Sequence, residues 1–272
     1  MAELRRELEA AKRAALVAGG RLSYHWHQRS FTVSSKAPGD PVTSADLEAN
    51  RAIARILRPA FPDYGWLSEE TADNPQRLER ERVWIIDPLD GTNEFIQGVP
   101  EFCVSVALVE RGEAVLGVIY NPIRRELYWG SRELGCFRGR QRVEVSRIPT
   151  LRRANILASR TEIKAGEWRI FEDALKTTAV GSVAYKLALI ASCFGDGTFT
   201  RRPKSEWDVA AGTALITAAG GCVTTLDGEP LRFNRPQVTI NGLVASNCLI
   251  HRQLLNFIAS RTAAALSSAM TA

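Results

Sequence analysis

The chain has 272 residues, of which 45% are hydrophobic, and its formal net charge is +5 at pH 7. This length and apolar content exclude a disordered chain and are sufficient for one large core or two layered halves. No apolar stretch approaches the roughly 20 residues that span a bilayer, and the charged amino terminus lacks the layout of a signal peptide, so we expect a cytoplasmic protein without membrane contact.

The basic residues do not indicate a nucleic-acid partner. They occur in short, scattered clusters, and no recognisable binding module or aromatic interleaving accompanies them: Arg124–Arg125, 138–142, Arg152–Arg153 and Arg201–Arg202. A solvated basic surface explains this pattern, and we predict no nucleic-acid binding.

The predicted elements alternate between helices and strands. Apolar side chains at helical spacing predict a helix over residues 3–18, which we expect to end at Gly19-Gly20, and a second helix over 44–58. Period-two patterning from Cys103 to Trp129, with turns at 111–113 and 121–122, predicts an antiparallel sheet. After a link near 146–153, a strand over 155–158 and helices over 183–193 and 209–219 predict a second half. We therefore divide this mixed α/β (α+β) chain into residues 1–150 and 151–272.

The five cysteines are odd in number, and no two of them have C-x-x-C spacing. They are Cys103, Cys136, Cys193, Cys222 and Cys248, and most of them lie inside apolar runs. We interpret all five as buried, reduced thiols.

The segment from Val83 to Phe95 carries the most chemical information. The apolar run Val83–Ile86 is typical of a buried strand, and two carboxylates, Asp87 and Asp90, follow it on either side of Pro88-Leu89. Gly91 permits a tight turn, after which backbone N–H groups of residues 91–93 could face an anion. Hard oxygen ligands beside a phosphate site suit Mg²⁺, although a turn with solvated acids would also show this pattern.

Three other segments place acids at the ends of predicted elements. Glu69 and Glu70 follow a short apolar run, Asp208 opens an Ala-rich helix, and Thr43 with Asp46 opens the helix over 44–58. Helix-dipole pairing would explain Asp208, and capping would explain Thr43 with Asp46.

These four segments together resemble the inositol monophosphatase superfamily of Mg²⁺-dependent, lithium-sensitive phosphatases. The resemblance spans about residues 36–221 and rests on P-V-T-x-A-D at 41–46, S-E-E at 68–70, W-I-I-D-P-L-D-G-T at 84–92 and W-D-x-A-A-G at 207–212. Within the superfamily, the 67–70 and 90–96 segments and Ser35-Lys36-Ala37 with Pro41-Val42-Thr43 look more like the CysQ-type 3′(2′),5′-bisphosphate nucleotidases.

The resemblance implies a layered α/β/α/β/α sandwich of the sugar-phosphatase type, usually a homodimer, with roles for specific residues. Metal ions would be held by Glu69, Asp87, the Leu89 carbonyl, Asp90 and Asp208, and the phosphate by Gly91, Thr92 and Asn93. Thr92 and Glu69 would orient and deprotonate the attacking water, while Asp46 would support the Thr92 hydroxyl. Glu70 is the weaker ligand candidate, and Glu94 is expected to be an ordinary helix residue.

A loop over the site is a further expectation from the resemblance. Lys36 and the segment 37–40 would form a mobile lid, for which the Pro38-Gly39 pair is suitable. A plain surface loop remains the alternative.

Substrate choice depends on residues outside the motifs. Where inositol monophosphatases carry an acid before the W-D motif, this chain has Thr200 or Arg201, depending on register, and a guanidinium can pair with a second phosphate. Lys186 matches a nucleotidase lysine that reaches the same group, or it lies on the exposed face of a helix. We therefore predict a phosphomonoesterase acting on 3′-phosphoadenosine 5′-phosphate. Inositol monophosphate or fructose 1,6-bisphosphate is the nearest alternative, and a non-catalytic phosphate-binding module is the remote one.

Overall fold

The computed structural model describes residues 4–37 and 39–270. Its helices are α1 (Arg5–Gln28), α2 (Ser44–Ala60), α3 (Thr92–Gln97), α4 (Arg160–Lys164), α5 (Val183–Ala191), α6 (Glu206–Ala218), α7 (His251–Met270) and the short 3₁₀ turns η1 (Pro75–Glu79) and η2 (Leu151–Arg153). Its strands are β1 (Val33–Ala37), β2 (Asp40–Thr43), β3 (Gly65–Ser68), β4 (Arg82–Asp90), β5 (Cys103–Glu110), β6 (Glu113–Asn121), β7 (Glu126–Ser131), β8 (Gly135–Arg138), β9 (Gln141–Val143), β10 (Asn155–Ser159), β11 (Lys176–Val180), β12 (Gly197–Ser205), β13 (Cys222–Thr224) and β14 (Thr239–Ser246).

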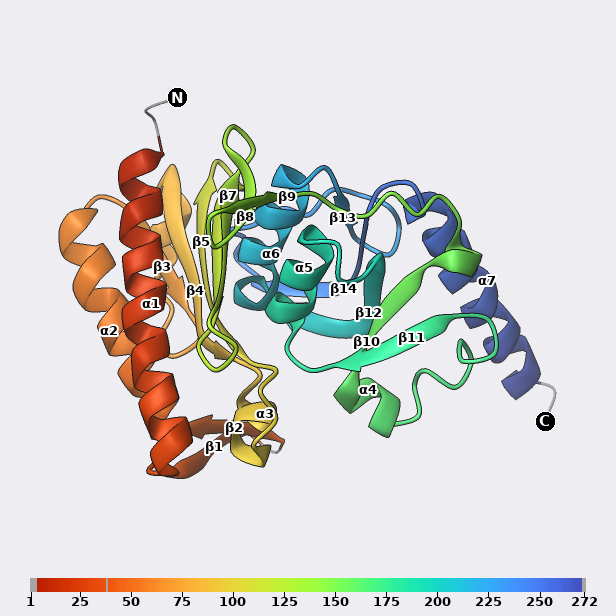
Figure 1. Ribbon diagram of the computed structural model, residues 1–272, viewed down its shortest axis with the longest axis horizontal. Coiled ribbons are helices and arrows are strands. Elements are labelled where there is room, and N and C mark those ends of the chain that lie inside the picture. Colours follow the sequence, from red (N-terminus) through yellow and green to blue (C-terminus); the bar gives the residue numbers. More distant parts are fainter. Residues whose placement is uncertain (1–3, 38, 271–272) are drawn as a thin grey trace.

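The strands form two large sheets and a hairpin. The larger sheet has the order β3-β4-β5-β6-β7-β8-β9, the smaller one has β11-β10-β12-β14-β13, and β1 pairs with β2. Helices α1 and α2 cover one face of the larger sheet, α5 and α6 lie between the sheets, and α7 covers the far side of the smaller sheet (Figure 1). This arrangement confirms the layered α/β/α/β/α fold that the sequence predicts.

Strand β4 is buried on both faces because its apolar residues enter two cores in turn. Trp84 and Ile86 pack under α1 and α2, whereas Val83 and Ile85 belong to the core between the sheets. The next residues of the same strand therefore emerge from the middle of the molecule, which is where the acids Asp87 and Asp90 lie.

Helix α6 approaches β6 closely at Gly117. A Cβ atom on Gly117 would lie 2.3 Å from the Ala211 carbonyl oxygen, so only glycine permits this approach. Because Asp208 is in the first turn of α6, this backbone contact fixes how deeply Asp208 sits behind the sheet.

The predicted end of the first helix is wrong. Helix α1 continues past Gly19-Gly20 to Gln28, and its C-cap Arg29 has a left-handed φ of 49°. A Cβ atom on Gly19 would lie 2.4 Å from the Tyr120 ring, so Gly19 permits close helix–sheet packing within the helix.

The prediction of five reduced thiols is also wrong. Cys222 and Cys248 form a disulfide with Cα atoms 5.0 Å apart, because β13 pairs with β14 and brings Cys222 beside Ser246. Cys103 and Cys136 are free and buried as expected, whereas Cys193 is exposed.

The boundary at residue 150 falls in the segment between β9 and β10, which links the two sheets. Helix α6 belongs to the second half by sequence, because it comes after residue 150, but it packs on the larger sheet of the first half. The division into two halves therefore stays a prediction. Within the described residues, no helix is long and apolar enough to cross a membrane.

Candidate functional site

The end of β4 forms a bulge followed by a sharp turn. Pro88 lacks a backbone N–H, and the pairing of β4 with β5 shifts register between Asp87 and Asp90. The Leu89 N–H donates to Asp87 Oδ1 at 2.9 Å. Gly91 then adopts a φ of 99°, a conformation that suits glycine, and starts α3. The bulge thus places both carboxylates and the turn of residues 91–93 side by side.

Asp46 connects the start of α2 to this turn. Its Oδ2 accepts hydrogen bonds from the Thr43 backbone N–H (2.9 Å) and hydroxyl (2.5 Å), which caps the helix as the sequence predicts. Its Oδ1 lies 3.1 Å from the Thr92 hydroxyl, which is also 3.1 Å from the Leu89 carbonyl oxygen. Asp46 therefore serves both as a cap and as a partner that orients Thr92.

Asp90 links the end of β4 to the start of α5. Its Oδ2 accepts hydrogen bonds from the Ser182 hydroxyl at 2.6 Å and from the Ala184 N–H at 2.5 Å, at the start of α5. Ser182 has a left-handed φ of 55°, so a strained backbone position supports this contact. The sequence motif that contains Asp90 gave no indication of Ser182.

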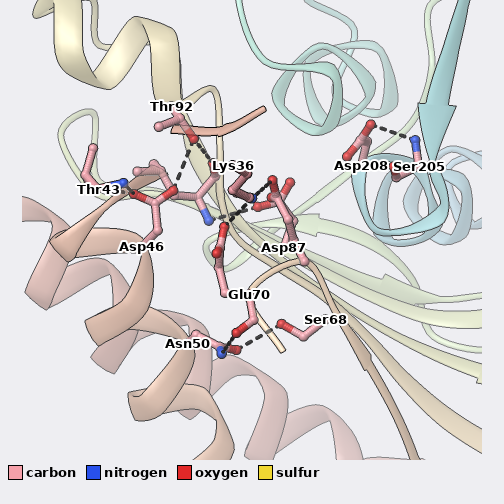
Figure 2. Close-up of polar contacts among 12 residues, drawn as sticks. Lys36, Thr43, Asp46, Asn50, Ser68, Glu70, Asp87, Thr92, Ser205 and Asp208 are labelled. Atoms are coloured by element: carbon pink, nitrogen blue, oxygen red, sulfur yellow. Dashed lines mark hydrogen bonds and ion pairs between the residues drawn. The ribbon is translucent and has the colours of Figure 1, made fainter. Parts of the chain in front are cut away.

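Lys36, from the β1–β2 hairpin, places its ammonium group among the acids. Its Nζ lies 2.6 Å from Glu69 Oε1 and 2.7 Å from Glu70 Oε1 (Figure 2). Asn50 holds the backbone beside Glu69 and Glu70. Its amide donates to the Glu70 carbonyl oxygen at 3.0 Å and accepts from the Ser68 hydroxyl at 2.9 Å. Glu70, the weaker candidate, thus lies in the site beside Glu69.

The acids repel one another electrostatically. Burial, reinforced by the charges of Glu69, Asp90 and Asp208, raises the pKa of Asp87 well above its usual range. Burial and the Asp90 charge raise the pKa of Asp208 to about 8, and burial also raises the pKa of Glu69. Glu69, Asp87, Asp90 and Asp208 therefore lie within electrostatic reach of one another and together favour a positive charge.

The donor chemistry of this cluster fits a divalent cation. Carboxylate oxygens and a peptide carbonyl are the ligands that Mg²⁺ prefers, and the mutual repulsion of the acids would be relieved by such an ion. Across residues 4–37 and 39–270, however, no three His, Cys, Asp or Glu side chains are already arranged to hold a metal ion. Binding would require the Lys36 contacts and the side-chain rotamers to adjust, so the ligand set stays a prediction.

Metal binding should stabilise the fold more at high pH than at low pH. A carboxyl group whose pKa is raised by folding binds its proton more tightly in the folded chain, so its contribution favours the fold at low pH and opposes it as the pH rises from about 4 to about 8. Mg²⁺ binds the ionised form, and saturation should raise the melting temperature by about 5 °C or more near pH 8. Thermal unfolding with and without EDTA at about pH 8 and about pH 5.5 measures this. An equal shift at both pH values would contradict it.

A cavity of about 230 Å³ opens beside the turn. Its lining combines the predicted phosphate turn with groups from both sheets: Asp90, Gly91, Thr92, Asn93, Glu94, Ser159, Glu162, Ser182, Lys186, Arg202 and Lys204, among others. Lys186 is buried, and burial with the neighbouring Lys204 lowers its pKa to about 8. The structure thus brings Lys186 to the cavity, where sequence alone also allowed an exposed helix face.

Arg201 does not line this cavity. The side chain is exposed, and its guanidinium carbon lies 5.6 Å from the centre of the Phe171 ring. Successive residues of β12 point to opposite faces, and its register shifts between Thr200 and Pro203, so Arg202 and Lys204 line the cavity instead. The prediction of Arg201 as a substrate contact is therefore not supported.

Glu162 and Glu94 are cavity residues that the sequence interpretation missed. Glu162 is buried and accepts hydrogen bonds from the Thr200 hydroxyl at 2.5 Å and from the Trp168 indole N–H at 3.2 Å. Its Oε1 lies 3.9 Å from Lys204 Nζ. Glu94, expected to be an ordinary helix residue, is buried and lies against Gly181.

The predicted lid covers residues 36–40, of which Pro38 lies outside the described residues. Gly39, Asp40 and Pro41 line the cavity, and Lys36 reaches the acids. The hairpin is therefore positioned at the site, and its mobility stays a prediction.

Comparison with known proteins shows the family. The model of the inositol monophosphatase family matches residues 3–266. An inositol-1-monophosphatase of Mesorhizobium japonicum is 36% identical over 92% of this chain and 95% of its own length. The IMPase of Thermotoga maritima superposes with a TM-score of 0.84 at 29% identity, covering 94% of this chain and 98% of that one.

The narrower resemblance to CysQ-type nucleotidases is weaker. CysQ from Bacteroides thetaiotaomicron, a bacterial member of the same family, superposes with a TM-score of 0.71 at 28% identity, over 89% of this chain and 97% of that one. The Mesorhizobium enzyme, at 36% identity, and the Thermotoga structure, at a TM-score of 0.84, are both more similar to this chain than that CysQ structure is. The chain belongs to the inositol monophosphatase family and is a metal-dependent phosphoric monoester hydrolase, as the sequence predicts.

Proposed function

We propose that this chain hydrolyses an inositol monophosphate, or a closely similar polyol phosphate, with Mg²⁺. The observation that carries the proposal is that Asp90, one acid of the cluster, lines the same cavity as Thr92 and the turn of residues 91–93, with the Thr92 hydroxyl held by Asp46. The name of the Mesorhizobium relative supports the substrate class. This choice replaces the nucleotide as the leading candidate.

Each group in the site has a chemical task in this proposal. Bound Mg²⁺ would lower the pKa of water and offset charge on the phosphate oxygens. The Thr92 hydroxyl, held by Asp46, orients the attacking water, and Glu69 accepts its proton. Backbone N–H groups of residues 91–93, at the start of α3, face the phosphate because the first turn of a helix leaves them unpaired.

The polar character of the cavity supports a polyol. Lys186 and Lys204 supply donors, whereas the acids Asp40, Asp90, Glu94 and Glu162 supply acceptors, so the lining has no surplus of cations. Arg202 adds little free charge because it forms an ion pair with Glu167. A ring with several hydroxyl groups uses both donors and acceptors, whereas a second phosphate would need a surplus of cations.

A bisphosphate is the second candidate, and the buried Lys186 beside Lys204 favours it. Phosphate release from inositol 1-phosphate, 3′-phosphoadenosine 5′-phosphate and fructose 1,6-bisphosphate should be compared at equal Mg²⁺. We expect inositol 1-phosphate to have the highest kcat/KM. If a bisphosphate is the better substrate by about tenfold or more, the polyol proposal is wrong while the phosphatase class stands.

Lys204→Gln sharpens that comparison, since Lys204 lies on β12 and is not a predicted metal ligand. Removing a cation that binds a second phosphate should lower kcat/KM for a bisphosphate by about tenfold or more. We expect a change of less than about fivefold for inositol 1-phosphate. The matched variant Lys164→Gln, at the end of α4 and outside the cavity lining, should affect neither substrate.

We also propose that the enzyme is a cytoplasmic homodimer that lithium inhibits, as the family resemblance implies. Sedimentation equilibrium should give twice the chain mass of 30.0 kDa. A monomer mass at micromolar concentration would show that the dimer proposal is wrong, and the proposed hydrolysis would be unaffected.

A further inference from the structure

Glu101 lies between α3 and β5, and its carboxylate ties this segment to two segments that follow strands of the smaller sheet. The Arg160 guanidinium, at the start of α4, donates to both carboxylate oxygens: Nη2 lies 2.8 Å from each, and Nε lies 3.2 Å from Oε2. The Gly181 N–H, just after β11, donates to Oε2 at 2.7 Å. The Glu101 side chain is only 13% exposed, so its charge depends on these donors.

Arg160 also holds the end of β11. Its Nη2 donates to the Ala179 carbonyl oxygen at 3.1 Å, in addition to its contacts with Glu101. The short segment of residues 179–181 is therefore fixed at both ends, by Arg160 at Ala179 and by Glu101 at Gly181.

The next residue, Ser182, has a backbone conformation that needs such support. Its φ of 55° is left-handed, which is costly for a residue with a Cβ atom and persists where the surrounding structure enforces it. The Ser182 hydroxyl accepts from the Tyr185 N–H at 3.0 Å and donates to Asp90 Oδ2 at 2.6 Å. The segment that Glu101 and Arg160 hold thus leads directly into the residue that orients Asp90.

Asp90 uses only one of its carboxylate oxygens in these contacts. Oδ2 accepts from the Ser182 hydroxyl and the Ala184 N–H, whereas Oδ1 accepts no hydrogen bond within the described part of the chain. The contacts therefore fix the carboxylate and leave Oδ1 for a cation. Of the described residues that line the cavity, none is Glu101 or Arg160, so their influence on the site passes through other residues.

We propose that Glu101 and Arg160 are positioning residues for Asp90. Their ion pair fixes the segment that leads into α5, and the first residues of α5 fix the Asp90 carboxylate. A carboxylate that is already oriented binds a divalent cation more tightly than one that binding must first order. Groups that orient a metal ligand in this way contribute about 10-fold to 100-fold to metal affinity. This inference rests on the proposed metal-dependent function, with Asp90 as a ligand.

Calorimetric titration of the metal-free, full-length protein with Mg²⁺ tests the proposal. We expect Arg160→Gln to weaken Mg²⁺ binding by about tenfold or more, because the Asp90 carboxylate loses its fixed orientation. At saturating Mg²⁺, kcat should fall by less than about threefold, since the bound ion then orders the carboxylate itself. A role in folding alone would lower the melting temperature and leave the Mg²⁺ affinity unchanged.

Three further variants locate the effect. Glu101→Gln keeps the shape of the side chain and removes its charge, so it should also weaken Mg²⁺ binding, and it keeps the test valid if Arg160→Gln does not fold. In a Ser182→Ala background, Arg160→Gln should cost less than about threefold, because the contact through which it acts is already lost. The matched control, Glu110→Gln, breaks an ion pair of 2.7 Å with Arg82 at the opposite end of β4 and should leave Mg²⁺ binding unchanged.

The possible results separate this proposal from the proposed function. Unchanged Mg²⁺ affinity in folded Arg160→Gln and Glu101→Gln would overturn the positioning role, as would an equal loss in Glu110→Gln or an undiminished effect in the Ser182→Ala background. If the unaltered protein binds Mg²⁺ but releases no phosphate from inositol 1-phosphate, the proposed substrate is wrong and the comparison of affinities still decides the positioning role. An unaltered protein that does not bind Mg²⁺ would refute both.

Discussion

Replacing Asp90 with Asn should abolish measurable phosphate release. The side chain is a predicted metal ligand, and loss of a group that only supports such a ligand already costs about 10-fold to 100-fold, so we expect a fall in kcat greater than about 100-fold. Asn keeps a carbonyl oxygen that can accept from the Ser182 hydroxyl and the Ala184 N–H. The link between β4 and the start of α5 should therefore survive, and circular dichroism should show an unchanged fold.

The matched control makes the same chemical change at an exposed acid. Asp63→Asn, in the turn before β3, should retain full activity. The melting temperature of Asp90→Asn should also respond less to Mg²⁺ than that of the unaltered protein. Normal phosphate release by Asp90→Asn, measured at saturating substrate, would refute the metal assignment.

Thr92→Val should produce the second large loss. Valine has the shape of threonine but cannot donate to Asp46 Oδ1 or the Leu89 carbonyl oxygen, so the attacking water would lose its orienting hydroxyl. Positioned proton transfer contributes about 10²-fold to 10⁴-fold in enzymes, and we expect kcat to fall by about 100-fold or more. KM should change little, because the backbone N–H groups that face the phosphate remain.

Thr92→Ser distinguishes the hydroxyl from the packing of the methyl group. Serine retains the oxygen, so it should recover most of the lost kcat in a steady-state phosphate assay. If Ser and Val are equally impaired, the methyl group matters through packing, and the proposed role of the Thr92 hydroxyl is wrong.

The fold was predictable where local pattern and tertiary packing agree. The apolar run of β4 and the alternation from Cys103 to Trp129 gave the first sheet, because each strand buries its residues against two fixed layers. Gly19 was wrongly interpreted as a helix end because the glycine is needed for tertiary packing, where helix α1 approaches the Tyr120 ring. The Cys222–Cys248 pair was likewise hidden, since only the pairing of β13 with β14 brings those residues together.

The site shows the same division between local and distant information. Asp87, Asp90 and the glycine turn belong to one short segment, so a motif could indicate them. Glu162 lies on α4 and Lys204 on β12, so only the folded chain brings these two side chains together. The predicted substrate contact at Thr200 or Arg201 stays a prediction, and the cavity is lined by Arg202 because a register shift follows Thr200 and alternation on β12 decides the facing side.

The contact of Gly117 with the Ala211 carbonyl has a consequence for evolutionary change. Most helices are held off a sheet by side chains whose sizes drift together over time, and their positions drift with them. At Gly117, helix α6 contacts the sheet through backbone atoms, so substitutions in the surrounding core can accumulate while this contact keeps the first turn of α6, with Asp208, close to β6. Any side chain at position 117 would push α6 away from β6. Gly117 should therefore be among the least replaceable residues of the chain.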